Sequence, residues 1–284
     1  MRPNVWGRFK EFVVMCLTRD RRMMRRLESR WAWVMRLPGA RLLLARYFQG
    51  FTSKRLRVGP VEVALQAPRH SYVAGRSSGV DQRGAFEAPL AQRFMESLDE
   101  SSVVWDIGAG IGIYARAATE RTRQPVLVVE PDPTSQLYLR RNLAGRPYRL
   151  ITKFVGETDD AVTATLDQIL AEGGLSPTHL KMDIEGAEIG AINGAQHLLR
   201  SRHPMVFVEF HERLIREEYK LDAAAIAEFF AGLRQLGYVL SFNGHHYAMH
   251  TSSDGLYDYA WHADPPNPIS YALVAVWTGS GSAI

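Results

Sequence analysis

The sequence has little of what marks secreted, disulfide-bonded or membrane-spanning proteins. Cys16 is the single cysteine among 284 residues, which excludes a disulfide framework and a cysteine-rich zinc site. The longest apolar run near the start covers residues 12–17, too short for a signal-peptide core or a membrane span. Internal repeats and low-complexity tracts are absent. We therefore expect a globular protein located in the cytoplasm.

Acidic residues are scarce in the first part of the chain. Residues 1–60 contain fifteen Lys/Arg but three Asp/Glu, a net charge of +12, whereas the whole chain carries +4. The remaining residues therefore carry −8. Trp6, Phe9 and Val13 recur at helical spacing among the basic residues. These patterns predict a basic amphipathic helical region at residues 1–70, joined to a larger domain at residues 71–284.

The basic region has three interpretations. Basic flanks with aromatic anchors favour peripheral binding to an anionic membrane at its inner face. A helical cap that packs on the acidic body, or on a second copy in a homodimer, fits the same pattern. Nucleic acid is a less favoured partner, because its recognition usually needs a groove or a base-reading element as well.

A strand followed by a glycine-rich turn dominates the middle of the chain. Residues 103–106 form an apolar run that ends in an acid, glycines follow at alternate positions, and an alanine-rich helical stretch covers residues 114–119. Such a turn lets a ligand approach the backbone without Cβ atoms in the way. The dinucleotide fingerprint would need glycine at position 113, where this chain has isoleucine. The G-x-G-x-G spacing instead resembles motif I of S-adenosylmethionine (SAM) methyltransferases, with expected cofactor contacts from Asp106, Gly108, Ala109, Gly110 and Gly112.

A second acid follows the next strand. Residues 126–129 are a continuous apolar run, and Glu130-Pro131 comes directly after it. An acid one strand–helix unit past the glycine turn accepts hydrogen bonds from both ribose hydroxyls of an adenosine ligand. The alternative is an incidental carboxylate at a strand end. Phe154 and Val155 follow a third strand, at a position where an adenine ring could be sandwiched.

The rest of the pattern alternates strands with helices, which predicts a doubly wound, mostly parallel sheet. The further expected strands lie at 148–152, 179–183, 205–211, 238–242 and 271–277, with short strand-like pieces at 56–58 and 61–65. The expected helices lie at 86–98, 134–143, 165–170, 188–200 and 223–236.

Taken together, the motifs resemble the FkbM family of SAM-dependent methyltransferases. The matching pieces are residues 106–112, Glu130-Pro131 with Asn142, residues 165–167, residues 181–188 and residues 204–211. The resemblance covers about residues 85–242 and implies a class I methyltransferase (Rossmann-like) α/β fold, with helices on both faces of seven strands, the last antiparallel. It also implies O-methylation, commonly of sugar or natural-product hydroxyls. The family usually has asparagine where Gly110 stands.

The candidate catalytic residues follow two of the expected strands. Asp183 and Glu209 should both point into the crevice above the glycine turn, where one could act as a general base. The pair could instead bind a divalent metal such as Mg²⁺ that polarises the acceptor hydroxyl. His211 is a second candidate base. Alternatively, Asp183 contacts the methionine end of SAM.

Other polar residues have structural interpretations. Glu185 or Glu188 could simply cap the helix that follows. His245 and His246 are expected in an exposed loop. Trp261 and residues 257–259 either form a sugar-stacking lid or pack their own loop.

These observations favour a SAM-dependent O-methyltransferase that acts on a hydroxyl of a glycan, glycolipid or related metabolite. A SAM-binding scaffold protein without turnover is an alternative, since a fold does not guarantee activity. A nucleic-acid methyltransferase is a third possibility, and would lose RNA binding steeply with rising salt.

Deletion of residues 1–60 tests the membrane interpretation. Each basic residue near an anionic surface contributes roughly 1 kcal/mol of attraction. We therefore expect anionic liposomes to retain the full-length protein more strongly than the shortened one in a sedimentation assay. Equal retention of the two proteins would show this interpretation to be wrong.

Overall fold

The computed structural model describes residues 51–68, 86, 88–244, 250–251 and 271–279. The helices expected in residues 1–50, the pair His245 and His246, and the aromatic residues 257–261 lie outside the described residues. Among the helices within these ranges, none combines the length and apolarity needed to cross a membrane.

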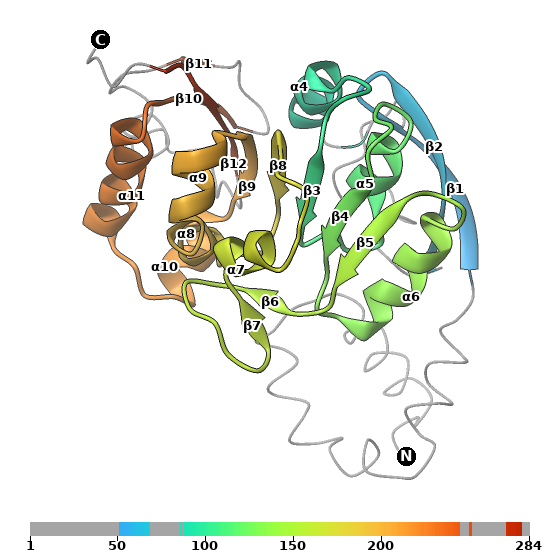
Figure 1. Ribbon diagram of the computed structural model, residues 1–284, viewed down its shortest axis with the longest axis horizontal. Helices are drawn as coiled ribbons and strands as arrows, with labels where there is room; N and C mark the ends of the chain where they lie inside the picture. Colours follow the sequence, from blue (N-terminus) through green and yellow to red (C-terminus); the bar gives the residue numbers. More distant parts are fainter. Residues whose placement is uncertain (1–50, 69–85, 87, 245–249, 252–270, 280–284) are drawn as a thin grey trace, which may run out of the picture.

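The described chain is built around an eight-stranded sheet with the order β11-β10-β12-β9-β8-β3-β4-β5 (Figure 1). Strands β9, β8, β3, β4 and β5 run parallel, and β12 is antiparallel to both of its neighbours, β9 and β10. This arrangement confirms the predicted seven-stranded sheet with an antiparallel last strand, and β11 adds a short edge strand. The strands are β3 (Val104–Ile107), β4 (Val126–Val129), β5 (Tyr148–Ile151), β8 (His179–Met182), β9 (Met205–Phe210), β10 (Tyr238–Gly244), β11 (His250–Thr251) and β12 (Tyr271–Trp277).

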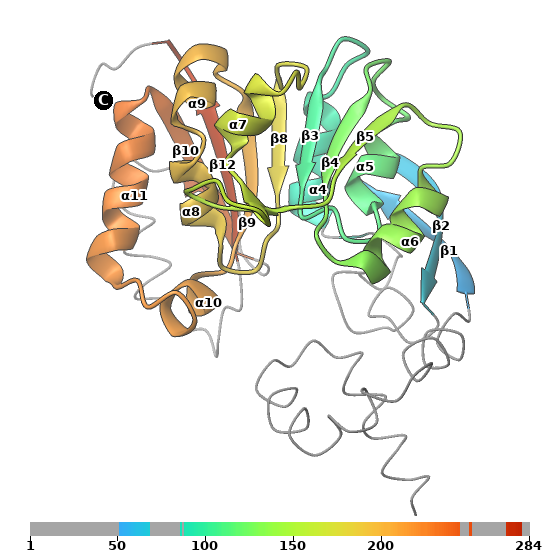
Figure 2. The ribbon, with the colours of Figure 1, turned by 60° about the horizontal axis from the view of Figure 1, so that its bottom comes forward.

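Helices cover both faces of the sheet, so its central strands are buried on both sides. All residues of β3, β4 and β8 are buried. On one face lie α7 (Leu166–Ala171), α8 (Glu188–Asn193), α9 (Gln196–Arg202) and α11 (Ala223–Gln235). On the other face lie α4 (Ala88–Ser97), α5 (Ile113–Ala118) and α6 (Pro133–Asn142) (Figure 2).

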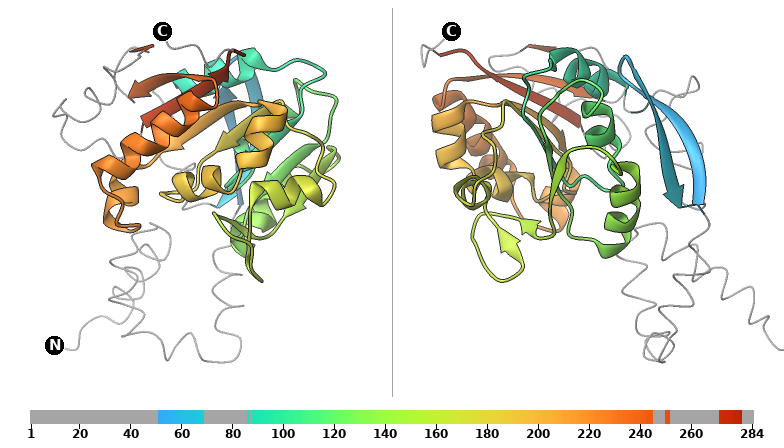
Figure 3. Two further views of the ribbon diagram at one scale, coloured as in Figure 1. Left: turned by 60° about the vertical axis from the view of Figure 1, so that its left-hand side comes forward. Right: turned by 45° about the vertical axis from the view of Figure 1, so that its right-hand side comes forward.

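A β-hairpin forms an additional layer outside α4, α5 and α6. Strands β1 (Phe51–Val58) and β2 (Val61–Pro68) pair antiparallel and lie on the outer side of these helices (Figure 3). Leu56, Val58, Val63 and Leu65 are buried in the same apolar core as the helices. The strand-like pieces predicted at 56–58 and 61–65 are confirmed as parts of β1 and β2. The helical interpretation of residues 1–70 is wrong for 51–68, because alternate apolar side chains bury one face of the hairpin.

The hairpin also changes how the basic region should be removed. A protein without residues 1–60 would lose all of β1 and expose the apolar side of β2. The liposome comparison is therefore best made with a protein that lacks residues 1–50.

The expected helix at 188–200 is in fact two helices. The first helix ends at Gly194, where an added Cβ would lie 2.2 Å from the carbonyl oxygen of Gly156. Asp167 then accepts hydrogen bonds from the backbone N–H groups of His197 and Leu198, in the first turn of α9. A short helix after β9, α10 (Glu212–Glu217), was not predicted, and β6 (Phe154–Val155) pairs with β7 (Thr163–Ala164) in a separate small sheet.

Candidate functional site

The glycine turn after β3 lies directly against the end of β8. The backbone N–H groups of Gly108 and Ala109 both donate to the carbonyl oxygen of Val129, at 2.8 and 3.0 Å. Gly108 has φ +78°, and an added Cβ would lie 2.0 Å from the carbonyl oxygen of Asp183. Glycine is therefore required here, and the turn is fixed next to the first candidate catalytic residue.

Glu130 holds the outer part of this turn. Its Oε2 accepts the N–H of Gly110 at 2.6 Å, and its Oε1 accepts the N–H of Asp132 at 2.8 Å. The side chain is buried, but each carboxylate oxygen has lone pairs for a further donor. Its ribose role stays a prediction. Gly110 has φ +56° and no atom within 4 Å of an added Cβ, so this side of the turn is open.

Asp106 is paired inside the protein with a buried lysine. The carboxylate Oδ2 accepts the N–H of Ala115 in the first turn of α5 at 2.9 Å. Lys181 is its neighbour on β8, and the ammonium lies 4.4 Å from the centre of the Tyr114 ring. Burial raises the pKa of Asp106 to about 6, although Lys181 and the Ala115 N–H act in the opposite direction. These contacts are structural, and direct binding of a cofactor by Asp106 stays a prediction.

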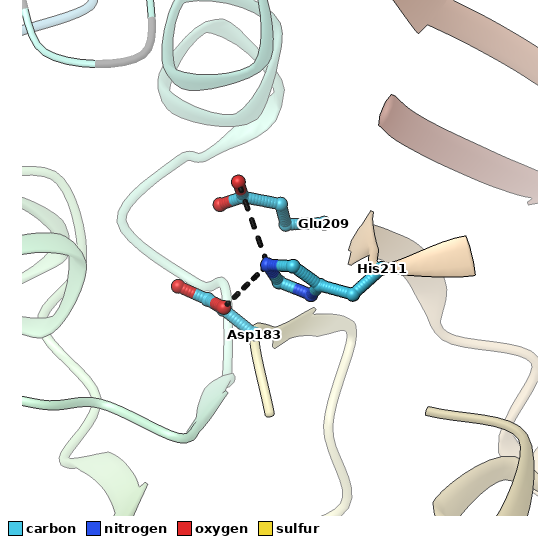
Figure 4. A group of neighbouring side chains, drawn as sticks. All are labelled: Asp183, Glu209 and His211. Atoms are coloured by element: carbon cyan, nitrogen blue, oxygen red, sulfur yellow. Dashed lines mark ion pairs between the residues drawn. The ribbon is translucent and has the colours of Figure 1, made fainter. Parts of the chain in front are cut away.

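Asp183, Glu209 and His211 converge at the carboxyl ends of β8 and β9 (Figure 4). The Nε2 atom of His211 lies 3.8 Å from Asp183 Oδ1 and 3.8 Å from Glu209 Oε1. The Asp183 side chain is 34% exposed, against 14% for Glu209 and 9% for His211. The three predicted catalytic residues are thus brought together, and the group opens to solvent on the Asp183 side.

Glu188 orients the imidazole of His211 through the ring nitrogen that does not face Asp183 and Glu209. This carboxylate is fully buried, and its Oε1 lies 3.0 Å from His211 Nδ1 and accepts the N–H of Gly186 at 3.0 Å. The helix-cap interpretation missed the histidine contact, because residues 188 and 211 meet only when β8 and β9 pair. Glu185 supplies the tight turn between β8 and α8, with φ +52°, a conformation uncommon outside glycine.

The carboxylates keep His211 charged. Burial lowers the pKa of the imidazole, but the hydrogen bond to Glu188 and the charges of three neighbouring carboxylates outweigh it and raise the pKa to about 9. Burial and the nearby Glu209 carboxylate raise the pKa of Asp183 to about 6, against the opposing effect of Lys181 and His211. At neutral pH His211 therefore carries a proton on each nitrogen, and Asp183 titrates close to neutrality.

The same three side chains are the metal-binding candidate among the described residues. One ligand atom from each of Asp183, Glu209 and His211 lies within 4.8 Å of the others. The sequence suggested Asp183 and Glu209 for Mg²⁺, and the structure adds a ring nitrogen to the set.

The remaining predicted residues have mixed environments. Phe154 is 58% exposed on β6, so its ring is available to a ligand, whereas Val155 belongs to the core. Pro131 is half-buried beside Glu130.

The motif residue Asn142 has a structural role, because its side chain pairs with the backbone of Gln66 and donates to the carbonyl of Ile111. It thereby ties β2 to the glycine turn.

The strand order, the glycine turn after β3 and the acid after β4 define a class I methyltransferase (Rossmann-like) fold. Residues 142–240 are identified as a Methyltransferase FkbM domain, which confirms the resemblance found in the motifs. A search of curated proteins finds no match.

Several solved structures are similar to this chain at low sequence identity. Methyltransferase FkbM from Methylobacillus flagellatus KT is 19% identical, covers 63% of this chain and 44% of its own, and has a TM-score of 0.45. This chain thus spans less than half of that protein. An rRNA methylase from Streptococcus thermophilus is 11% identical, with coverages of 65% and 91% and a TM-score of 0.44. A precorrin-6y C5,15-methyltransferase from Geobacter metallireducens GS-15 is 14% identical. The match covers 65% of this chain and 84% of that protein, with a TM-score of 0.40.

Two alanine substitutions test the packing of the glycine turn. In Gly108→Ala the new Cβ meets a backbone carbonyl that cannot move without displacing β8, so we expect a loss of more than about 4 kcal/mol in the free energy of unfolding. Gly110→Ala meets no atom and should cost about 1–2 kcal/mol of backbone strain. Denaturant unfolding measures both. Equal losses would contradict the close approach of the turn to Asp183.

The raised pKa of His211 predicts a pH dependence of stability. A histidine whose folded pKa lies above its unfolded value stabilises the protein at low pH, and this contribution is lost as pH rises through the folded pKa. Between about pH 7.5 and pH 10, a folded pKa near 9 corresponds to a loss of about 2 kcal/mol. The stability difference between wild type and His211→Gln should shrink by this amount. A difference that does not change with pH would contradict the charge on His211, and His197→Gln on the surface is the control.

Proposed function

We propose that the protein is a SAM-dependent O-methyltransferase that methylates a hydroxyl of a glycan, glycolipid or related metabolite. The observation that supports this most is the position of Asp183. It ends β8, touches the glycine turn through its carbonyl oxygen, and directs its carboxylate toward Glu209 and His211. A cofactor held by the turn would therefore have its reactive end beside a proton acceptor.

The reaction needs both in-line placement and removal of one proton. The acceptor oxygen forms a bond to the methyl carbon while the sulfur–carbon bond breaks, and the electron pair of that bond stays on sulfur. Positioning of this kind supplies roughly 7–11 kcal/mol of barrier reduction, and a general base contributes about 10²–10⁴-fold. The hydroxyl proton passes to a carboxylate of the site.

Asp183 is the better base of the three candidates. Its pKa of about 6 lies near neutrality, so the carboxylate is ionised and still takes up a proton readily. His211 already carries its second proton at neutral pH and cannot accept another. Its positive charge instead holds the two carboxylates close together, since an oxygen of each lies 3.8 Å from Nε2.

The basic region at residues 1–60 supports a lipid-linked acceptor. A net charge of +12 on that segment, against −8 on the remaining chain, would draw the enzyme to an anionic surface. A hydroxyl on a membrane-attached glycan would then lie within reach of the site.

Asp183→Asn tests the proposed base. The amide keeps the shape of the side chain but cannot take the proton, so turnover should fall by about 10²–10⁴-fold with little change in SAM affinity. Calorimetry measures SAM binding, and release of S-adenosylhomocysteine with a panel of sugar and glycolipid hydroxyls measures turnover. Glu172→Gln, which changes an exposed carboxylate at the end of α7, is the matched control.

Two outcomes would contradict the proposal in different ways. Unchanged turnover in Asp183→Asn would remove this residue from catalysis. Tight SAM binding without transfer to any hydroxyl would favour a SAM-binding scaffold protein instead.

A further inference from the structure

We propose that Asp183, Glu209 and His211 form a binding site for one divalent transition-metal ion, held in place by the buried carboxylate of Glu188. The site itself is argued from the geometry of these side chains, and its part in catalysis rests on the proposed function.

The three side chains surround a common point. Nε2 of His211 lies 3.8 Å from an oxygen of each carboxylate, and all three ligand atoms fall within 4.8 Å of one another. Atoms at these separations leave a point roughly 2.2–2.5 Å from each, close to the bond lengths of about 2.0–2.2 Å for nitrogen and oxygen ligands. Rotation of the partly exposed Asp183 side chain can close this difference.

The histidine is arranged as metal-binding histidines usually are. Such a residue donates its other ring N–H to a carboxylate or carbonyl, which fixes the ring and increases the basicity of the ligating nitrogen. Here Nδ1 is bonded to Glu188 at 3.0 Å, and Glu188 is in turn held by the N–H of Gly186. Because the His211 side chain is 9% exposed and its Nδ1 is bonded to Glu188, Nε2 is the atom directed at the two carboxylates.

The charges also favour a cation at this point. Asp183, Glu209 and the fully buried Glu188 place three carboxylates around one imidazole. Without a metal ion, the protonated imidazole of His211 supplies the positive charge between Asp183 and Glu209. A bound metal ion would supply that charge instead. The ion competes with the Nε2 proton, as for any histidine ligand.

The ligand types indicate which ions should bind. One imidazole nitrogen with two carboxylate oxygens suits Mn²⁺, Co²⁺ or Zn²⁺ better than Mg²⁺, which prefers oxygen ligands alone. The sequence suggested Mg²⁺ because it offered two carboxylates. With the His211 nitrogen added, we instead propose a first-row transition metal. Three protein ligands leave further positions for water or an acceptor hydroxyl, whose proton such an ion makes more acidic.

Mn²⁺ binding to the full-length, untagged protein tests the site directly. After treatment with a chelator and its removal, the protein is titrated with Mn²⁺ and with Mg²⁺, and binding is measured by calorimetry and by the electron paramagnetic resonance signal of free Mn²⁺. We expect one Mn²⁺ per chain, bound more tightly than Mg²⁺. Asp183→Asn and His211→Gln should abolish this binding.

Glu188→Gln separates a positioning role from direct ligation. Loss of a carboxylate behind a ligating histidine typically weakens metal affinity by about 10–100-fold, and we expect this range. His197→Gln and Glu172→Gln, both exposed, should bind Mn²⁺ as the wild type does. Circular dichroism and SAM calorimetry on each variant establish that it is folded.

The results distinguish the metal site from the proposed function. The chain has other histidines, including His245, His246 and His262, so Mn²⁺ binding that persists in Asp183→Asn and His211→Gln would overturn the site. Absence of saturable Mn²⁺, Co²⁺ and Zn²⁺ binding in the wild type would overturn it too, even if methyl transfer proceeds. Metal binding without transfer to any hydroxyl would leave the site in place and reject the O-methyltransferase.

Discussion

The contact between the glycine turn and the end of β8 governs the rest of the site. The N–H of Asp183 donates to the carbonyl of Ile107 at 2.9 Å, which extends the pairing of β3 and β8 by one residue. One residue further along β3, Gly108 packs so closely on the Asp183 carbonyl that no side chain fits. A ligand bound at the turn and a substrate beside Asp183 would be neighbours for this reason.

Two buried pairs of opposite charge surround this contact. Asp106 faces Lys181 on one side of the sheet, and Glu188 holds His211 at the end of β9. Charges removed from water are costly unless they are paired, and each pair here is also hydrogen-bonded or capped by backbone groups. The raised pKa of Asp106 shows that its pairing with Lys181 compensates burial only in part. Such incomplete compensation is common where side chains do chemistry.

The motif residues divide into those that shape the fold and those that face the site. Thr165 caps α7, Asp167 caps α9, and Asn142 joins β2 to the glycine turn, so none of these three side chains needs a ligand to explain its contacts. Asp183 and Glu209 instead direct their carboxylates toward His211 at the carboxyl ends of β8 and β9. The first three residues therefore account for contacts within the fold, and the last two belong to the candidate site.

The order of strands and helices and the approach of Asp183 to Glu209 followed from the sequence, because continuous apolar runs and acids at strand ends are local patterns. The same patterns left two features of the structure open. Glu188 and His211 are 23 residues apart and meet only through the pairing of β8 with β9. The hairpin at 51–68 was predicted only as two short strand-like pieces within a basic helical region, because its alternating apolar face is stabilised by burial against α4 and α5. The sequence by itself determined which residues could do chemistry, whereas the tertiary structure decided which of them carry a proton and which could share a metal ion, since burial and distance are properties of the packed chain.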